Sequence, residues 1–305
     1  MTIPKGTTLT IDEQSAAAPL AEADFPHHQQ VVQRFGDLAP DGTTSTVALS
    51  RLFEHPRVGL RFSRFDKLAA DGGFGPFHIL FVGQCVERHT AFGKFGGTIR
   101  IGTGIQAVGR SSYTYGQGMF VDGNLVATAD ATIVFADKSG PITLPDELLA
   151  DLEELRLAET GVAVASKPDP RRRERQYYPA AATIHARVGD VDLNRHVNYI
   201  AQLGWYDEAI ASHAHGLLGD GSTRKLPRFV PWRYRVNYLG EVLYPGTYDI
   251  GIAVSGHDEH TVHYELGLFD SGQCLGTADA AAPRGTLPGA ALADAAPRTR
   301  GEVTE

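Results

Sequence analysis

Gly97-Thr98-Ile99-Arg100-Ile101-Gly102 recurs later in the chain as Gly246-Thr247-Tyr248-Asp249-Ile250-Gly251, at an offset of 246 − 97 = 149 residues. The same offset, without a gap, pairs further tyrosines, glycines and phenylalanines, and it maps Thr128-Ala129-Asp130 onto Thr277-Ala278-Asp279. About a third of the aligned positions are identical over this stretch. Similarity at a fixed spacing is the sequence signature of a repeated structural unit.

A second pair of matching segments lies upstream. Arg34-Phe35-Gly36-Asp37 matches Arg187-Val188-Gly189-Asp190 at an offset of 190 − 37 = 153, so an insertion or deletion of 153 − 149 = 4 residues separates the two blocks. We therefore predict two copies of one unit, each of roughly 130 to 150 residues, which is an ordinary domain size.

Each copy is predicted to consist of one helix followed by antiparallel strands. In the second copy, apolar residues recur every three or four positions from Asn198, and Gly216 is a helix stop signal. Runs bounded by Gly, Pro and Asp turns predict the strands. The expected elements are strands at Arg228–Tyr238, Thr247–Val254, Thr261–Phe269 and Cys274–Ala280, and, in the first copy, a helix near Thr44–Glu54 with strands near Phe77–Arg88, Thr98–Ala107, Ser111–Val121 and Leu125–Phe135. One helix against a curved antiparallel sheet, formed twice, is an α+β arrangement.

The regions outside the two copies have different compositions. Residues 145–176 combine a short amphipathic helix at Pro145–Leu155 with a basic linker at Lys167–Arg175, which we interpret as a solvated surface segment. The two ends are rich in Ala, Pro, Thr and Glu and show no periodicity, which is typical of disorder. The expected organisation is a disordered segment at 1–23, a first repeat at 24–144, the helix and linker at 145–176, a second repeat at 177–283 and a disordered tail at 284–305.

Composition excludes several classes of protein. With 42% hydrophobic and 21% charged residues the chain is typical of a globular protein, and no window approaches the roughly 20 apolar residues of a membrane-spanning helix. The net charge of −8 argues against nucleic-acid binding. The N-terminus lacks a secretory pattern, and the two cysteines, Cys85 and Cys274, are too few for a disulfide scaffold or a zinc site. We expect a cytoplasmic protein with no metal and no cofactor.

The junction of strand and helix in the second copy is unusually polar, and it reads Asp190-Val191-Asp192-Leu193-Asn194-Arg195-His196-Val197-Asn198-Tyr199. Asn194 or Asn198 would cap the helix, and Asp190 would sit in a turn. Capping does not also need Asp192 and His196. A carboxylate at a helix N-terminus stays ionised and can act as a base, and the N–H groups there can hold an oxyanion. These groups together could activate water against an acyl carbonyl.

The first copy is an internal control for this interpretation. Its equivalent segment, Asp37-Leu38-Ala39-Pro40-Asp41-Gly42-Thr43-Thr44-Ser45, keeps the first Asp but has Ala39 for Asp192 and Thr43 for His196. Residues able to cap the helix remain, while the acid–base residues do not. The cluster is therefore predicted to serve catalysis rather than helix initiation.

These residues carry a resemblance to a known family. A strand ending in Asp-x-Asp, followed by His-Val-Asn at a helix start, resembles the hotdog thioesterases of the 4-hydroxybenzoyl-CoA thioesterase type. The string Asp190-x-Asp192-x-Asn194-x-His196, with Gly204-Trp205 further along, looks most like the acyl-ACP thioesterases, which are tandem double-hotdog proteins. The resemblance covers about residues 25–282.

The resemblance implies roles for individual residues. Asp192, Asn194 and His196 match the catalytic Asp, Asn and His of that family, and the first copy is expected to contribute mainly to the acyl pocket. Asn198, Tyr199 and Asn237 are the candidates for substrate binding. One departure is that Asn237, in the run Tyr234-Arg235-Val236-Asn237-Tyr238, stands where the family has a further catalytic Glu. Asp192 would then act without that Glu, or with help from Glu208 or Glu241.

The sequence thus predicts a thioesterase that hydrolyses acyl-CoA or acyl-ACP, either as a monomer or as a homodimer. Two alternatives stay open: a hotdog hydratase or dehydratase acting on an enoyl or 3-hydroxyacyl thioester, and a non-catalytic protein that binds acyl thioesters. The sequence does not decide the acyl chain length, nor does it choose between CoA and a carrier protein.

Overall fold

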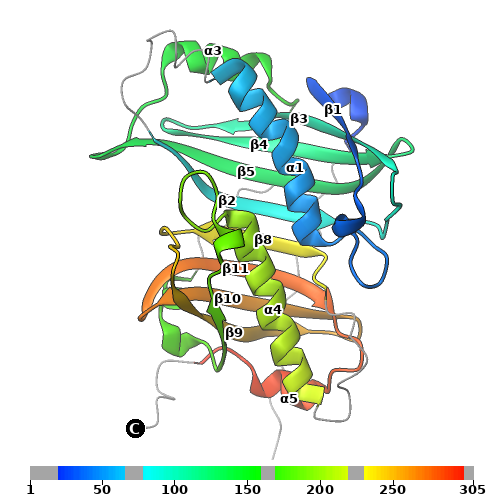
Figure 1. Ribbon diagram of the computed structural model, residues 1–305, viewed down its shortest axis with the longest axis vertical. Helices are drawn as coiled ribbons and strands as arrows, with labels where there is room; N and C mark the ends of the chain where they lie inside the picture. Colours follow the sequence, from blue (N-terminus) through cyan, green and yellow to red (C-terminus); the bar gives the residue numbers. More distant parts are fainter. Residues whose placement is uncertain (1–19, 66–77, 159–168, 219–229, 299–305) are drawn as a thin grey trace, which may run out of the picture.

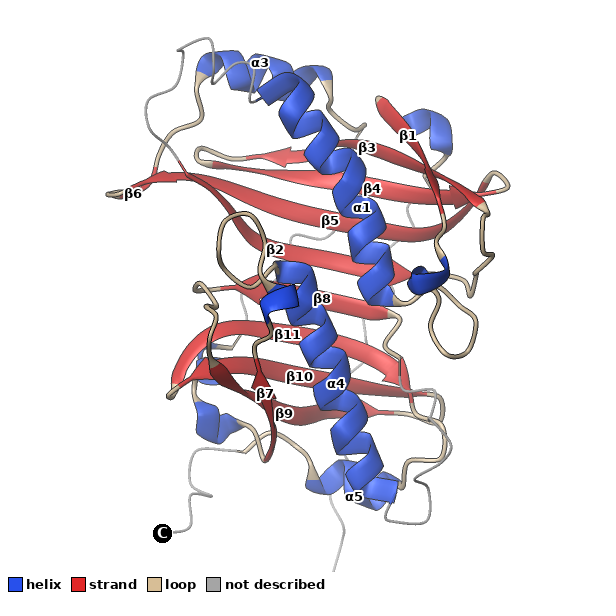
Figure 2. Cartoon of the chain, in the orientation of Figure 1, coloured by secondary structure: helices blue, strands red, loops and turns tan. Residues whose placement is uncertain are grey.

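The computed structural model describes residues 20–65, 78–158, 169–218 and 230–298. Its centre is one antiparallel sheet of 11 strands, and two long helices, α1 and α4, lie on the same face of it (Figure 1, Figure 2). The strand order is β1-β3-β4-β5-β2-β8-β11-β10-β9-β7, with β6 paired to β5. The sequence prediction of helices against a large antiparallel sheet is confirmed.

Apart from the short strand β6, the two halves of the chain contribute the same helices and strands in the same order. The first half contains β1 (His27–Val32), α1 (Thr46–Leu60), β2 (His78–Arg88), β3 (Thr98–Val108), β4 (Ser112–Val121), β5 (Asn124–Asp137), β6 (Gly140–Pro141) and α3 (Asp146–Glu154). The second half contains β7 (Ala180–His185), α4 (Tyr199–Leu218), β8 (Arg233–Tyr238), β9 (Thr247–His257), β10 (Thr261–Asp270), β11 (Gln273–Pro283) and α5 (Gly289–Asp294). The predicted strands agree with these within a few residues, except that Phe77 and Arg228, which we expected to begin two of them, lie outside the described residues.

The halves meet through their central strands. β2 pairs with β8 in antiparallel register, with Gly83 opposite Asn237 and Val86 opposite Tyr234. This pairing satisfies the backbone groups that would otherwise form two open sheet edges. Each half also packs its long helix against its own part of the sheet. Leu49 and Phe53 of α1, and Leu203 and Ile210 of α4, are buried there.

The duplicated glycines have a shared structural reason. On the sheet face opposite the helices, Phe25 lies over Gly102 and Gly118, and Tyr178 lies over the matching Gly251 and Gly267. A Cβ atom at any of these glycines would come within 2.5 to 2.8 Å of the aromatic ring. Both rings then pack edge-on against a phenylalanine of the sheet, Phe120 or Phe269. Each half therefore needs glycine where an aromatic ring covers its strands.

Helix lengths differ from the sequence prediction. α1 continues beyond Glu54 to Leu60, although Pro56 lies inside it, and α4 continues past Gly216 to Leu218. Pro56 is buried, as are Phe53 and Leu60 on either side of it. Packing of this apolar face outweighs the hydrogen bond that proline removes from a helix interior.

The segments outside the copies are partly more ordered than expected. α3 is amphipathic as predicted, with Leu148 and Leu152 buried. The tail expected to be disordered from residue 284 contains α5, whose Leu292 is fully buried, and Glu22–Asp24 forms a 3-10 helix. In the basic linker, Arg172 is not solvated, because its side chain is 5% exposed and its guanidinium lies 2.9 Å from Asp279. Residues 1–19 and 299–305, also expected to be disordered, lie outside the described residues. No helix in the described ranges is long and apolar enough to cross a membrane.

Candidate functional site

The loop that leads into α4 is held in place by Asp190. Its carboxylate accepts hydrogen bonds from the backbone N–H of Arg187 at 2.9 Å and from the indole N–H of Trp205 at 3.2 Å. Its carbonyl accepts a third from the N–H of Asn198 at 2.8 Å. These contacts fix the loop against the first turns of the helix, so Asp190 has the structural role expected of a turn residue.

Asp192 is the centre of the polar cluster. Its Oδ1 accepts the backbone N–H of Asn194 at 2.8 Å and lies 3.7 Å from Nδ1 of His196. Its Oδ2 lies 3.5 Å from the side-chain nitrogens of both Asn194 and Asn198. Arg195, at a φ of 68°, closes the turn that makes these contacts possible. The structure therefore brings the three predicted catalytic residues together around one carboxylate.

Asn198 has two roles at the start of α4. Its Oδ1 accepts the N–H of Ile200 at 2.7 Å, which caps the helix, and its Nδ2 faces Asp192. The N–H groups in the first turn of any helix lack acceptors within that helix, and they carry its partial positive charge. Asp192 is thus a carboxylate beside a positive helix end, and its side chain is 20% exposed.

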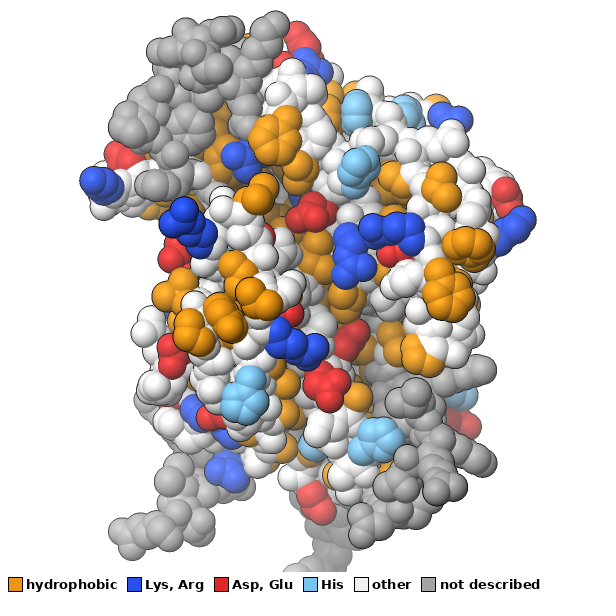
Figure 3. Space-filling model, viewed as in Figure 1, with side chains coloured by type: hydrophobic (Ala, Val, Ile, Leu, Met, Phe, Trp, Pro, Cys, Tyr) orange, Lys and Arg blue, Asp and Glu red, His pale blue; other side chains and the backbone are white. Residues whose placement is uncertain are grey.

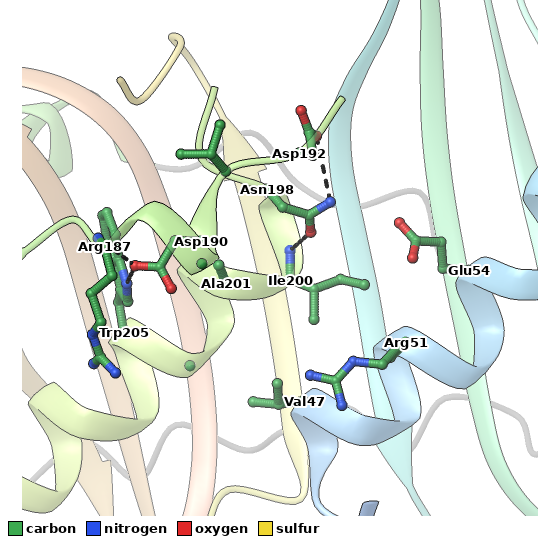
Figure 4. Close-up of a pocket in the computed structure, with 13 residues that line it drawn as sticks. Val47, Arg51, Glu54, Arg187, Asp190, Asp192, Asn198, Ile200, Ala201 and Trp205 are labelled. Atoms are coloured by element: carbon green, nitrogen blue, oxygen red, sulfur yellow. Dashed lines mark hydrogen bonds between the residues drawn. The ribbon is translucent and has the colours of Figure 1, made fainter. Parts of the chain in front are cut away.

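A cavity of about 570 Å³ opens beside this cluster, between α1 and α4 (Figure 4). Figure 4 shows Asp192 and Asn198 on one side of it and Glu54 and Arg51 of α1 on the other. Acidic and basic side chains lie close together near the centre of this face of the molecule (Figure 3). The lining residues are Val47, Arg51, Glu54, Arg187, Gly189, Asp190, Val191, Asp192, Asn198, Ile200, Ala201, Gly204 and Trp205.

Asn194 and His196 lie at the edge of the site. They contact Asp192 but do not line the cavity, and the His196 side chain is 33% exposed. Leu193, between Asp192 and Asn194, is fully exposed at the tip of the loop. The cluster is therefore open to solvent on one side and to the cavity on the other.

Tyr199 does not line the cavity but contacts Glu54, which does. Its hydroxyl donates to Glu54 Oε1 and accepts from Arg57 Nη2, both at 2.7 Å, and its ring stacks on Phe81 at 4.1 Å between centroids. Burial raises the pKa of this phenol well above its usual value, so the hydroxyl stays protonated. The side chain thus reaches from the second half into the first.

Asn237 does not line the cavity. Tyr234 and Tyr238 of β8 point toward the helices, because their hydroxyls donate to Asp207 and to the carbonyl of Tyr199. Successive side chains of a strand point to opposite faces, so Asn237 faces away from α4. The position expected for a further acid is therefore on the far face of the sheet, and neither Glu208 nor Glu241 lines the cavity.

The residue that sequence reasoning missed is Glu54. It is the carboxylate in the cavity that comes from the first half, and Arg51 and Arg57 on the same helix were missed with it. A signal was present, because the offset of 153 matches Glu54 to Asp207, an acidic residue in both helices.

Among the described residues, no group of three or more His, Cys, Asp or Glu side chains is placed to hold a metal ion. Burial raises the pKa of Cys85 to about 11, as expected of an inert thiol.

The sequence matches no protein family model and no curated protein. Solved structures do share its fold. The 12:0-ACP thioesterase from Umbellularia californica is 15% identical, with a TM-score of 0.63 over 84% of this chain and 97% of that one. An acyl-ACP thioesterase from Bacteroides thetaiotaomicron is 13% identical, with a TM-score of 0.64 over 86% and 99%. A putative oleoyl thioesterase from Lactobacillus plantarum is 14% identical, with a TM-score of 0.65 over 86% and 95%.

These likenesses extend over nearly the full length of each solved structure. The chain therefore has a hotdog-like fold with a large antiparallel sheet, which it shares with these solved acyl-ACP thioesterases. Because the identities are low, the likeness concerns the fold, and the chemistry has to be argued from the site itself.

Proposed function

We propose that this protein is a double-hotdog thioesterase that hydrolyses an acyl group from CoA or from a carrier protein. Its repeats span residues 24–144 and 177–283, and the site belongs to the second. The observation that carries the proposal is the Asp192 carboxylate, which is held by amide groups at the N-terminus of α4 and faces a cavity between the helices. The shared fold of the acyl-ACP thioesterases supports it.

Asp192 acts as the base in the proposed reaction. It takes a proton from water, whose oxygen attacks the thioester carbonyl carbon, and the resulting tetrahedral intermediate expels the sulfur as the C–S bond breaks. The proton held by Asp192 then passes to the departing thiolate, which leaves a free acid and a thiol. A positioned general base contributes about 100- to 10,000-fold to a rate.

The surrounding groups orient the reactants. The first turn of α4 places N–H groups where the carbonyl oxygen becomes negative, which is the arrangement of an oxyanion hole. Asn194 and Asn198 orient the Asp192 carboxylate, and His196, whose Nδ1 lies 3.7 Å from Asp192 Oδ1, is placed to orient the attacking water. Glu54 and Arg51, across the cavity, extend the binding surface to the first repeat.

Two cationic residues favour a phosphate-bearing substrate. Arg51 and Arg187 both line the cavity, and the substrates of both classes attach through a phosphorylated pantetheine arm. The guanidinium of arginine matches the geometry of a phosphate. The proposed partner is therefore the thioester of CoA or of an acyl carrier protein.

Thiol release from a panel of acyl-CoAs and acyl-ACPs tests the function. We expect wild-type turnover, and a loss of about 100- to 10,000-fold in kcat/KM for Asp192→Asn. The matched control is Asp41→Asn in the first repeat, where the carboxylate accepts the N–H and hydroxyl of Thr43 at 3.0 and 2.7 Å. This variant should keep wild-type turnover.

Other results would identify a different function. Full activity in Asp192→Asn would show that another residue is the base. Hydration of crotonyl-CoA, followed by its absorbance, would indicate a hydratase. Thermal stabilisation by acyl thioesters without any thiol release would indicate a binding protein.

A further inference from the structure

The cavity beside Asp192 does not reach the sheet. Its lining residues belong to the two helices, to Asn198 at the start of α4 and to the loop at residues 187–192, and within the described part of the chain no strand residue lines it. An acyl chain bound with its carbonyl near Asp192 must therefore extend between the helices and the sheet. What fills that space decides which acyl groups fit.

Tyr199 packs between α1 and the two central strands, β2 and β8. Its ring stacks on Phe81 of β2 with an interplanar angle of 24°, and it meets the ring of Tyr238 of β8 edge-on at 6.1 Å. Its hydroxyl is bonded to Glu54, which lines the cavity, and to Arg57, which is 5% exposed. The cavity and the Tyr199 side chain are thus adjacent through Glu54, and the ring is held from both halves.

Polar groups surround this aromatic cluster. Arg57 donates to Gln117 Oε1 at 3.0 Å, and Gln117 in turn donates to the hydroxyl of Thr103 and to the carbonyl of Phe53. On the other side, Gln84 donates to the hydroxyl of Tyr238 at 2.6 Å. A long aliphatic chain placed here would displace these hydrogen bonds and leave buried polar groups unpaired, which is costly. The interior therefore favours an acyl group that ends before it.

We infer that Tyr199 forms the floor of the acyl site and restricts the enzyme to short acyl groups. The inference rests on the proposed thioesterase function and adds a specificity-determining residue to it. Tyr199 belongs to the second repeat, but the contacts that fix its ring come mainly from the first. At the matching position, 199 − 153 = 46, the first repeat has Thr46, whose hydroxyl donates to the carbonyl of Pro231.

The test is the chain-length profile of kcat/KM, measured by thiol release from acetyl, butanoyl, hexanoyl, decanoyl and palmitoyl thioesters on both carriers. The wild type should be fastest with the short acyl groups and at least about tenfold slower with the palmitoyl group, because methylene groups that do not fit the site lower kcat/KM. Tyr199→Ala should move the maximum to longer chains. Tyr199→Phe, which keeps the ring, should keep the wild-type profile, and so should Thr46→Ala.

The outcomes separate this inference from the proposed function. If no thioester is hydrolysed, the proposed function fails. If the wild type hydrolyses palmitoyl thioesters as fast as butanoyl ones, the function stands and the inference about Tyr199 is wrong. An unchanged profile in a folded Tyr199→Ala protein, with folding checked by its circular dichroism and Tm, would also overturn it. Tyr199→Phe is a second test, because it removes the hydroxyl and keeps the ring. If this variant also shifted the chain-length profile to longer chains, the ring would not be the floor of the acyl site.

Discussion

The two loops that precede α1 and α4 have the same backbone plan and different side-chain chemistry. In the first, Asp37 is 1% exposed and its carboxylate is paired with Arg34 at 3.0 Å and with Arg51 at 3.7 Å. In the second, the matching Asp190 binds Trp205 instead, and the position that matches Arg51 is Gly204 (51 + 153 = 204). A Cβ atom at Gly204 would meet no atom within 4 Å. The Arg51 side chain occupies this position in the first half, whereas in the second half Gly204 leaves the position open and lines the cavity.

The helix caps show why the polar cluster is more than a structural need. Ser45 caps α1 by accepting the N–H of Ala48 at 3.0 Å, and Asn198 caps α4 through Ile200. One small polar residue is therefore enough to start this helix. Asn198 differs from Ser45 because it also reaches a carboxylate.

The strongest test of that difference removes both caps in turn. Ser45→Ala and Asn198→Ala should each lower the free energy of unfolding by about 1 kcal/mol, measured in urea. Asn198→Ala should in addition lower kcat/KM by about 10- to 100-fold, since a hydrogen bond to a charged group contributes about 1.5 to 3 kcal/mol. Ser45→Ala should leave kcat/KM unchanged. Equal losses of activity in the two variants would contradict the division of roles.

A second test concerns the sheet face opposite the helices, where the two halves have matching glycines and aromatic rings. Gly102→Ala and Gly251→Ala each place a methyl group against an aromatic ring, Phe25 or Tyr178. Overpacking of this kind costs about 1 to 3 kcal/mol. We expect similar decreases in the free energy of unfolding for both variants. A decrease confined to one half would show that the aromatic cover matters to that half alone.

The smallest expected effect concerns Asp207, the residue of α4 that matches Glu54 of α1. Burial raises the pKa of Asp207 to about 7, although its carboxylate accepts a hydrogen bond from Tyr234 at 2.6 Å. The folded state therefore holds this proton more tightly than the unfolded state. Its stabilising contribution is complete below pH 4 and is lost as the pH rises through 7.

Urea unfolding between pH 5 and 7.5 measures this contribution. Over that range the wild type should lose on the order of 1 kcal/mol more stability than Asp207→Asn, because only the wild type has a buried carboxyl that ionises. The effect is small because Asp207 is partly exposed to solvent. Tyr234→Phe removes the bond that lowers the pKa of Asp207, so it should move the loss to higher pH. Parallel curves for the wild type and Asp207→Asn would assign the pH dependence to other groups.

The strands and the polar loop around Asp192 could be predicted because their signals are local. Turn residues such as Pro245 and Gly246 bound the strands, and Asp192 and His196 lie within five consecutive positions of the chain. The contact of Tyr199 with Glu54 spans 145 residues and leaves no local pattern. Arg172 was misjudged for the same reason, since its partner Asp279 lies in a distant strand.

The face of the sheet on which Asn237 lies could have been predicted from the sequence. The alternation of Tyr234, Val236 and Tyr238 marks one apolar face of β8, and Asn237 necessarily belongs to the other. The family resemblance identified position 237 along the strand, but the two-residue alternation of a strand determines which face of the sheet its side chain lies on. Hydrophobic alternation within the chain was the better guide.

The pairing of β2 with β8 also determines how this protein can change over time. In a symmetric homodimer every substitution appears in both subunits, so a residue useful to one site is imposed on the other. Here the two units are covalently joined and paired within one sheet, so each position exists once. Arg51 and Gly204 can differ for that reason. Under the proposed function, the first unit can also change to suit the acyl group without altering the residues around Asp192.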